Sequence, residues 1–226
     1  MHFVDAKGIL TGKNGFQGMN IYRGCTHGCI YCDSRSKCYQ FTHSFEDIEV
    51  KQNAPELLEK ALKSKRKKCM IGTGAMSDPY MHCEKDLQLT RKCLEMMQER
   101  GIPTVVWLTP ILPFINDTKE NISAILNECA RTGVKGVIDF GMGLTLRDGD
   151  REYYYEALDK HFPGMKERYI RQYGNAYELP SPNSRELRAL FQDICKKNGI
   201  LSTPDECFQF LSELPEKYTQ MSLFDL

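Results

Sequence analysis

Segments of strand character alternate with segments of helical periodicity, and this alternation limits the chain to few folds. Strands are expected where β-branched, aromatic and other apolar residues run into glycine or proline, at 69–73, 104–108 and 134–144. Helices are expected between them, after Pro55, over 84–99 and from Asp117, with Glu120 completing a capping box and Gly133 at the end. This order predicts parallel β/α units, open or closed into a barrel.

Ligands of such folds bind at the carboxyl ends of the strands. Three loops therefore share one expected functional rim: GAMSDPY (74–80), TPILP (109–113) and GMG (141–143). From about Arg151 the pattern becomes helical, with helices expected at 151–160, 165–173, 183–199 and 202–214. We expect a core over residues 1–180 and a helical C-terminal extension with a tail over 181–226.

The composition excludes several classes of protein. The chain has 226 residues with 30 basic and 30 acidic side chains, so no overall field marks a general nucleic-acid binder. The sequence lacks the pattern of a signal peptide and any apolar run of about 20 residues, the length that a membrane span needs. A cytoplasmic location is expected. The ten cysteines then indicate metal binding or catalysis before disulfides, because the cytosol keeps thiols reduced.

Three of these cysteines, Cys25, Cys29 and Cys32, lie in the stretch NIYRGCTHGCIYC within an expected loop at 20–38. Iron–sulfur clusters are held by thiolates at such short spacings. Three thiolates on a cube of four irons leave one iron open to a ligand that is not protein. Gly24 and Gly28 allow the tight turns that a bulky cluster requires. The side chains of Arg23 and His27 can offset the negative charge of sulfide and thiolate.

Two other interpretations of the motif stay open. Cys38 follows six residues after Cys32, so four cysteines can form a zinc site, although zinc motifs usually pair two distant hooks. The thiols can also be purely structural. The remaining strand and helix cysteines read as core residues: Cys69, Cys93, Cys129 and Cys195.

The motif and its surroundings resemble a known family. C-x₃-C-x-aromatic-C followed by β/α units resembles the radical S-adenosylmethionine (SAM) superfamily. The words YRGCTHGCIYCDSRS, GAMSDPY and WLTPILPFINDT resemble its spore photoproduct lyase-like branch over about residues 4–180. The resemblance implies a partial (β/α) barrel and a [4Fe–4S] cluster held by Cys25, Cys29 and Cys32. It further implies that SAM binds the fourth iron, with Tyr31 near the adenine.

By the same resemblance, the segment after the first strand receives the SAM ammonium. Ser77 and Asp78 offer a hydroxyl and a carboxylate, both of which accept hydrogen bonds from an ammonium. The alternative is a simple turn, because Ser-Asp-Pro is typical of turns. Glu84 is a weaker candidate, and the pair His82 and Cys83 indicates little.

The chain departs from the family pattern in length. Arg100 leads almost directly into GIPTVVW, where the lyase-like branch has about two further β/α units. The barrel is therefore expected to be shortened or open. Either the protein binds a cluster and handles SAM poorly, or a second subunit completes the half-barrel. Uncovered sheet edges favour oligomerisation or lower the stability of the chain.

The chain ends in KYTQMSLFDL, and Gln220, Met221, Ser222, Leu223 and Phe224 resemble the peptide that docks to the bacterial sliding clamp. A glutamine fixes the register and two apolar side chains fill a pocket. The alternative is that Leu223 and Phe224 fold back onto the protein's own surface.

The expected function is reductive cleavage of SAM to a 5′-deoxyadenosyl radical, which abstracts hydrogen, with damaged or modified nucleic acid as a substrate class. An electron donor and DNA are the implied partners. No residue is assigned a catalytic role. The alternative is a non-catalytic iron–sulfur or Cys₄ zinc protein that docks to the clamp through its tail.

Overall fold

The computed structural model describes residues 1–12, 15–32, 34, 40–146 and 150–213. The chain divides into two compact units. Unit 1 comprises Met1–Thr26, Thr42–Met97 and Phe208–Leu226, and unit 2 comprises His27–Phe41 and Gln98–Cys207. Each unit has its own elements and its own core.

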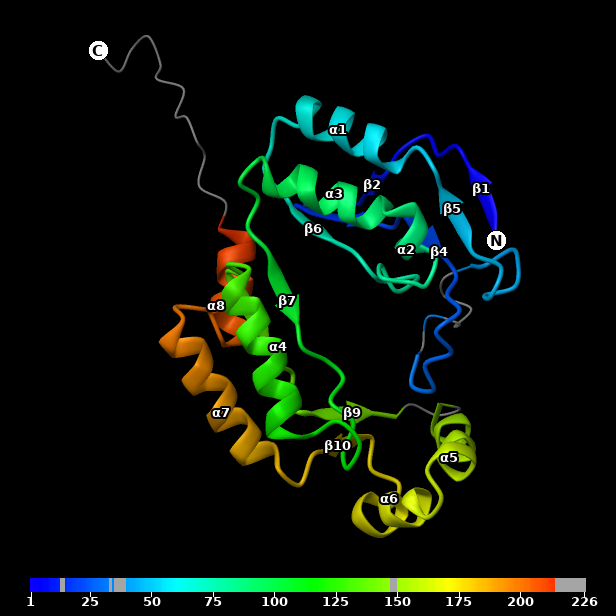
Figure 1. The fold of residues 1–226 in the computed structure, drawn as a ribbon, viewed down its shortest axis with the longest axis vertical. Coiled ribbons are helices and arrows are strands. Elements are labelled where there is room, and N and C mark those ends of the chain that lie inside the picture. Colours follow the sequence, from blue (N-terminus) through cyan, green and yellow to red (C-terminus); the bar gives the residue numbers. More distant parts are fainter. Residues whose placement is uncertain (13–14, 33, 35–39, 147–149, 214–226) are drawn as a thin grey trace. The chain divides into compact units, whose positions relative to one another are not determined.

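Unit 1 holds two small three-stranded sheets and their helices (Figure 1). The first sheet has the order β1-β5-β4, with β1 parallel and β4 antiparallel to the central strand β5. The second has the order β2-β3-β6, with β6 parallel to β3. The elements are β1 (His2–Val4), β2 (Leu10–Thr11), β3 (Phe16–Met19), β4 (Tyr22–Arg23), β5 (Glu49–Lys51), α1 (Ala54–Ser64), β6 (Met70–Gly72), α2 (Glu84–Leu87) and α3 (Leu89–Gln98).

One expected helix of unit 1 is two helices. The apolar periodicity over 84–99 predicts a single element, but Gln88 has a left-handed backbone (φ 52°) and separates α2 from α3. Glu84 explains the break, because its carboxylate accepts a hydrogen bond from the backbone N–H of Thr90 at 2.8 Å. The side chain of Glu84, in α2, thus caps the start of α3. The expectation for α1 is confirmed, since Pro55 lies in its first turn.

Unit 2 contains a parallel pair, β7 with β8, and an antiparallel pair, β9 with β10. The expected strand over 134–144 is two strands, because the chain turns between β8 and β9. Its elements are β7 (Val105–Trp107), α4 (Lys119–Arg131), β8 (Gly136–Ile138), β9 (Gly143–Thr145), α5 (Asp150–His161), α6 (Met165–Tyr173), β10 (Glu178–Pro180) and α7 (Ser184–Lys197). The helix α8 (Pro204–Ser212) crosses the division between the units.

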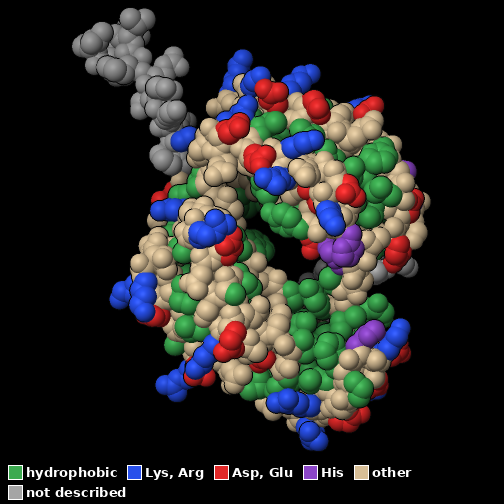
Figure 2. All heavy atoms as spheres, in the orientation of Figure 1, with side chains coloured by type: hydrophobic (Ala, Val, Ile, Leu, Met, Phe, Trp, Pro, Cys, Tyr) green, Lys and Arg blue, Asp and Glu red, His purple; other side chains and the backbone are tan. Residues whose placement is uncertain are grey.

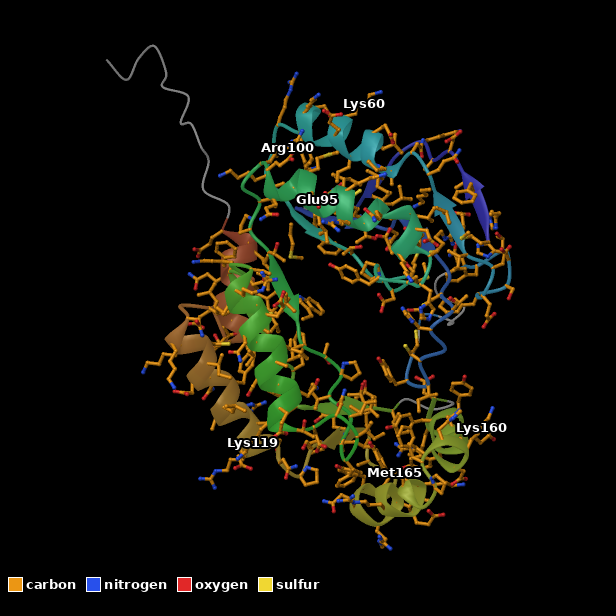
Figure 3. The ribbon with its side chains drawn as sticks, viewed as in Figure 1. Lys60, Glu95, Arg100, Lys119, Lys160 and Met165 are labelled. Carbon is orange, nitrogen blue, oxygen red and sulfur yellow. The ribbon has the colours of Figure 1, made fainter. Side chains whose placement is uncertain are left out.

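The two helices α4 and α7 pack together in one core of unit 2. Leu126 and Cys129 of α4 and Phe191 of α7 are buried in it. At one end, the Lys119 ammonium pairs with the Glu186 carboxylate at 2.5 Å, and Figure 3 shows Lys119 at the start of α4. The helix that opens the expected C-terminal extension therefore shares a core with an element of the expected 1–180 region.

The start of α4 corrects one prediction. The N-cap is Thr118, whose hydroxyl accepts a hydrogen bond from the N–H of Asn121 at 3.2 Å, and not Asp117. Asp117 is buried and accepts a short hydrogen bond from the Ser181 hydroxyl. The side chain of Asn183 likewise makes no cap hydrogen bond at α7. Gly133 has a φ of 72° just past α4, as expected at that position.

Each of the three expected strand segments contains a strand with a parallel partner. In the segment 69–73, β6 pairs with β3, and β7 of the segment 104–108 pairs with β8 of the segment 134–144. Within the described residues the strands form four separate sheets, none of which closes into a barrel. A barrel of the radical SAM type stays a prediction. On the face drawn in Figure 2, basic and acidic side chains are interspersed, without a broad field of one sign. None of the helices in the described part of the chain has the length and apolar character of a membrane span.

Candidate functional site

The cysteine motif starts where β4 ends, in unit 1. Gly24 has a φ of 91°, and a Cβ at this position would lie 2.4 Å from the carbonyl oxygen of Phe45. Only glycine fits this approach. The next residue, Cys25, donates its backbone N–H to that same carbonyl of Phe45 at 2.9 Å. Cys25 is 7% exposed and belongs to the apolar core of unit 1.

The GAMSDPY loop follows β6 and contacts the residues just before Cys25. The backbone N–H of Gly24 donates to the Met76 carbonyl at 3.2 Å. The hydroxyl of Ser77, which is buried, donates to the Tyr22 carbonyl at 3.2 Å. Two segments that are about 50 residues apart in the sequence are thus adjacent within unit 1.

The two predicted ligands of the SAM ammonium differ in their surroundings. A hydroxyl that donates one hydrogen bond keeps its lone pairs as acceptors, so Ser77 can still accept from an ammonium. Asp78 is exposed, and its carboxylate accepts the N–H of Tyr80 at 2.7 Å, which is the geometry of a turn. The turn is therefore present at Asp78, and a binding role for either side chain stays a prediction.

Glu84, the weaker candidate, has a structural use. Its buried carboxylate accepts a short hydrogen bond from the Tyr22 hydroxyl as well as the bond from Thr90 that caps α3. Burial and the neighbouring Glu84 raise the pKa of Tyr22 well above its usual value, so the phenol remains protonated. Sequence reasoning missed the role of Tyr22, although its place three residues before Cys25 is a signal.

Cys83 packs against the same core as Cys25. Burial raises the pKa of the Cys83 thiol, and the charges of Glu84 and Cys25 act in the same direction. Cys83 is half-buried. This thiol therefore lies in the neighbourhood of Cys25, which the sequence did not indicate.

The second part of the motif belongs to unit 2. The backbone N–H of Cys32 donates to the carbonyl of Cys29 at 3.2 Å, which closes a turn between two half-buried thiols. Between them, Ile30 and Tyr31 pack against a core of unit 2. That core consists of Leu144, Leu146, Tyr154, Tyr155, Leu158, Tyr169 and Leu179.

The residues of the motif suit an iron–sulfur cluster. Cys25 is described in unit 1 and Cys29 and Cys32 in unit 2. Cys25 is buried in an apolar core, Cys29 and Cys32 are half-buried, and low exposure is one of the factors that set the potential of such clusters. The donor set therefore fits the group.

The other expected rim segments lie in unit 2 and are tightly packed. Leu112 and Ile115 pack against the core that receives Tyr31. After β8, the Asp139 carboxylate accepts the N–H groups of Gly141 and Met142 at 2.7 and 2.8 Å, and Arg188 lies 3.3 Å away. Sequence reasoning missed Asp139, and the strand-ending DFG sequence is the signal for it.

Several of the site residues predicted from the sequence lie outside the described residues, namely Cys38, Gln220, Leu223 and Phe224.

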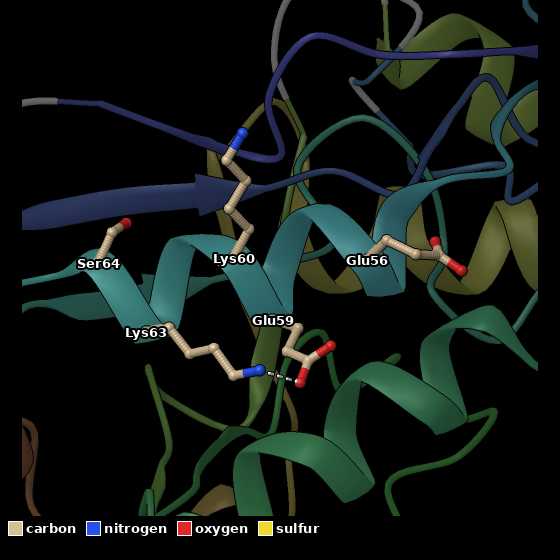
Figure 4. Close-up of a pocket in the computed structure, with 5 residues that line it drawn as sticks. All are labelled: Glu56, Glu59, Lys60, Lys63 and Ser64. Carbon is tan, nitrogen blue, oxygen red and sulfur yellow. Dashed lines mark ion pairs between the residues drawn. The ribbon is translucent and has the colours of Figure 1, made fainter.

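Two hollows on the surface of the described residues contain none of the predicted site residues. The first, of about 400 Å³, is lined by residues of α1 and holds an ion pair between Glu59 and Lys63 at 2.7 Å (Figure 4). The second is lined in part by Arg151, whose guanidinium donates to the Ala176 carbonyl at 2.6 Å and to neighbouring carbonyls. Exposed ion pairs stabilise little, and the donors of Arg151 serve the backbone. Neither hollow indicates a ligand.

No family model matches the chain, and no solved structure matches it. The chain is similar to an uncharacterized protein of Methanocaldococcus jannaschii, with 36% identity over 85 residues. That match covers 37% of this chain and only 31% of the relative.

Longer matches come from mycobacteria. Uncharacterized proteins of Mycobacterium tuberculosis and Mycobacterium bovis are 24% identical over 248 aligned positions, covering 75% of this chain and 70% of each relative. The aligned stretch is longer than the whole of this chain. The mycobacterial proteins therefore carry residues within the matched region that this chain lacks.

Proposed function

We propose that the chain is a radical SAM protein in which Cys25, Cys29 and Cys32 hold a [4Fe–4S] cluster, with one iron left for SAM. The observation that carries the proposal is the junction in unit 1 between the cysteine motif and the GAMSDPY loop. Hydrogen bonds from Gly24 to Met76 and from Ser77 to Tyr22 join these segments. Ser77 at this junction offers a hydroxyl that can accept a hydrogen bond close to the first cysteine of the motif, which supports the proposal.

The proposed division of labour follows from the residues. When bound, the reduced cluster supplies the electron that splits SAM into methionine and a 5′-deoxyadenosyl radical. The chain holds the Cys25 backbone through Phe45 and keeps its thiol out of water. Ser77 accepts from the SAM ammonium while it donates to Tyr22, and the exposed Asp78 adds a carboxylate. Tyr31 presents an aromatic ring for the adenine.

The substrate is a further part of the proposal. The resemblance to the lyase-like branch supports damaged or modified nucleic acid as the substrate class. The terminal residues Gln220, Leu223 and Phe224 support docking to a sliding clamp, which would bring the protein to DNA. Deleting residues 220–226 is expected to abolish co-purification with purified clamp, and unchanged binding would refute the docking.

A second candidate function is cluster binding without turnover of SAM. One observation favours it: the mycobacterial relatives have residues within the aligned region that this chain lacks. Missing β/α units would remove part of the wall that binds SAM. In this alternative the chain either acts as a non-catalytic protein or needs a second copy to complete the site.

Anaerobic reconstitution with iron and sulfide tests the cluster. The wild-type protein is expected to bind about four irons and four sulfides per chain and to show the broad visible absorbance of a [4Fe–4S] cluster. Cys29→Ser is expected to lose both, whereas Cys69→Ser, a half-buried cysteine outside the motif, is expected to retain them. A colourless wild-type protein that holds one zinc through the same cysteines would overturn the proposal.

A further inference from the structure

Three side chains of unit 1 with metal-binding groups lie together, away from the cysteine motif in the sequence. They are His2, His43 and Glu49, and one ligand atom from each lies within 4.8 Å of the others. All three are half-buried. Two imidazoles and one carboxylate form a donor set that proteins use for zinc and other divalent transition metals.

The backbone explains why these groups meet. His2 of β1 pairs with Glu49 of β5 in a parallel ladder, so their side chains leave the same face of the sheet. His43 comes from the segment just before β5, and its ring packs edge-on against that of His2 with 5.3 Å between the centroids. Two strands and one loop therefore contribute one ligand each.

Each imidazole is oriented through its Nδ1 atom. The Nδ1 of His2 lies 3.0 Å from a carboxylate oxygen of Asp47, and the Nδ1 of His43 lies 2.9 Å from the carbonyl oxygen of Ser44. Because carboxylates and carbonyls only accept, Nδ1 carries the proton in the neutral ring, and the lone pair belongs to Nε2. A carboxylate that holds the far nitrogen of a histidine is the usual outer support of a metal ligand.

The charges around the group are nearly balanced. Asp47 pairs with the Met1 ammonium at 2.8 Å as well as with His2, and Lys51 and Arg23, which is opposite Glu49 in the β4–β5 ladder, lie near Glu49. Binding of a metal ion must therefore come from ligation by the two imidazoles and Glu49 rather than from a negative field. Tetrahedral zinc with bonds of about 2.1 Å places its ligand atoms about 3.4 Å apart. The ligand atoms, which lie up to 4.8 Å apart, must therefore draw closer by as much as about 1.4 Å, which rotation of half-exposed side chains allows.

We propose that His2, His43 and Glu49 bind a divalent transition metal ion of the zinc type, with Asp47 supporting His2 and one coordination position left to water. The ion would join β1 and β5 to the segment at 43–45. That segment carries the Phe45 carbonyl, which holds the backbone of Cys25. The proposed ion would therefore fix the segment beside the cysteine motif. The proposal of this metal site does not depend on the proposed radical SAM function.

Cobalt titration of the full-length, untagged protein tests the site, in a background where Cys25, Cys29 and Cys32 are all serine. Cobalt can replace zinc, and its absorption spectrum shows which ligands bind it. Thiolate ligands add a strong charge-transfer band in the near ultraviolet, whereas nitrogen and oxygen ligands do not. We expect one equivalent to bind with a nitrogen–oxygen spectrum. Glu49→Gln and His43→Asn are expected to weaken binding at least tenfold, and Asp47→Asn about tenfold. His161→Asn, at an exposed position of α5, is the control and should bind normally.

Zinc should also raise the melting temperature of the parent protein and not that of Glu49→Gln, because binding to the native state alone stabilises it. This second measurement separates loss of the site from loss of folding, since each variant has its own melting curve without metal. Absence of saturable cobalt binding, a thiolate spectrum, or equal affinity in Glu49→Gln and the parent would each overturn the proposal.

Discussion

The Ser77 hydroxyl donates a hydrogen bond to the backbone carbonyl of Tyr22 at 3.2 Å, and both residues are buried. This contact ties the loop after β6 to the strand that leads into the cysteine motif. A second hydrogen bond, from the backbone N–H of Gly24 to the Met76 carbonyl, joins the same two segments just before Cys25. The residues just before Cys25, the first cysteine of the motif, are thus held by contacts from a distant part of the sequence.

Ser77→Ala is expected to lower the free energy of unfolding by about 1–2 kcal/mol, because the buried Tyr22 carbonyl loses its partner. Urea denaturation followed by circular dichroism measures the change. Ser64→Ala is the matched control, since the Ser64 hydroxyl also donates to a backbone carbonyl but at an exposed site. If the two variants lose the same stability, the contact between Ser77 and Tyr22 has no special weight.

Ser77→Ala also separates the two roles assigned to this hydroxyl. The variant should still bind the cluster, because Cys25 keeps its bond to Phe45, but it should bind SAM more weakly than Ser64→Ala does. Equal SAM affinity in the two reconstituted variants would limit Ser77 to a structural role.

Tyr154 makes the stability of the protein sensitive to alkaline pH. Burial raises its pKa to about 12, although the hydrogen bond to Tyr169 acts in the opposite direction. A tyrosine of the unfolded chain titrates near pH 10, so from there the unfolded state loses a proton that the native state keeps. The stability that Tyr154 contributes is complete below about pH 10 and is lost as the pH rises through about 12.

Urea unfolding at a series of alkaline pH values checks this dependence. Tyr154→Phe is expected to flatten the decline in stability, since phenylalanine has no proton to lose. Tyr153→Phe, which alters an exposed neighbour on α5, should leave the decline unchanged. The same slope in both variants would contradict the role given to Tyr154.

The cysteines should differ in their reaction with an alkylating reagent. Cys93 and Cys195 are fully buried, and burial raises the pKa of their thiols to about 12 and about 11. The thiolate is the reactive form, so both should resist iodoacetamide at neutral pH in the native protein and react once it is unfolded in urea. Mass spectrometry of peptides locates the label.

The motif cysteines provide the contrast in the same experiment. Cys29 and Cys32 are half-buried and should be labelled in the protein without a cluster. Reconstitution should protect them, because bound thiolates do not react. Labelling of Cys29 and Cys32 that reconstitution leaves unchanged would argue against their binding a cluster.

Local patterns in the sequence predicted much of the fold and less of the site. Proline in the first turn of α1 and the β-branched run of β7 depend on neighbouring residues, and both elements were correctly expected. The buried Asp117 was not expected, because it depends on Ser181, 64 positions away. The break at Gln88 was not expected either, because it depends on the Glu84 carboxylate accepting the N–H of Thr90, which apolar periodicity does not reveal. Cys93, Cys129 and Cys195 are buried as expected, whereas Cys69 is half-buried.

The same limit applies to the candidate site. The three cysteines of the motif are close in sequence, so their spacing alone indicated shared chemistry. The bond from Ser77 to Tyr22 joins residues more than 40 positions apart, and so does the approach of His2 to His43 and Glu49. No sequence pattern links such residues, because strand pairing and loop packing decide which of them meet.

The most direct test of the account is the product formed from SAM. Wild-type protein, reconstituted with its cluster and chemically reduced without oxygen, is incubated with SAM, and 5′-deoxyadenosine is measured by chromatography and mass spectrometry. We predict 5′-deoxyadenosine in the wild type and in Cys69→Ser, and none above background in Cys29→Ser. A fully loaded wild-type protein that forms no more 5′-deoxyadenosine than Cys29→Ser would contradict the account and favour the non-catalytic alternative.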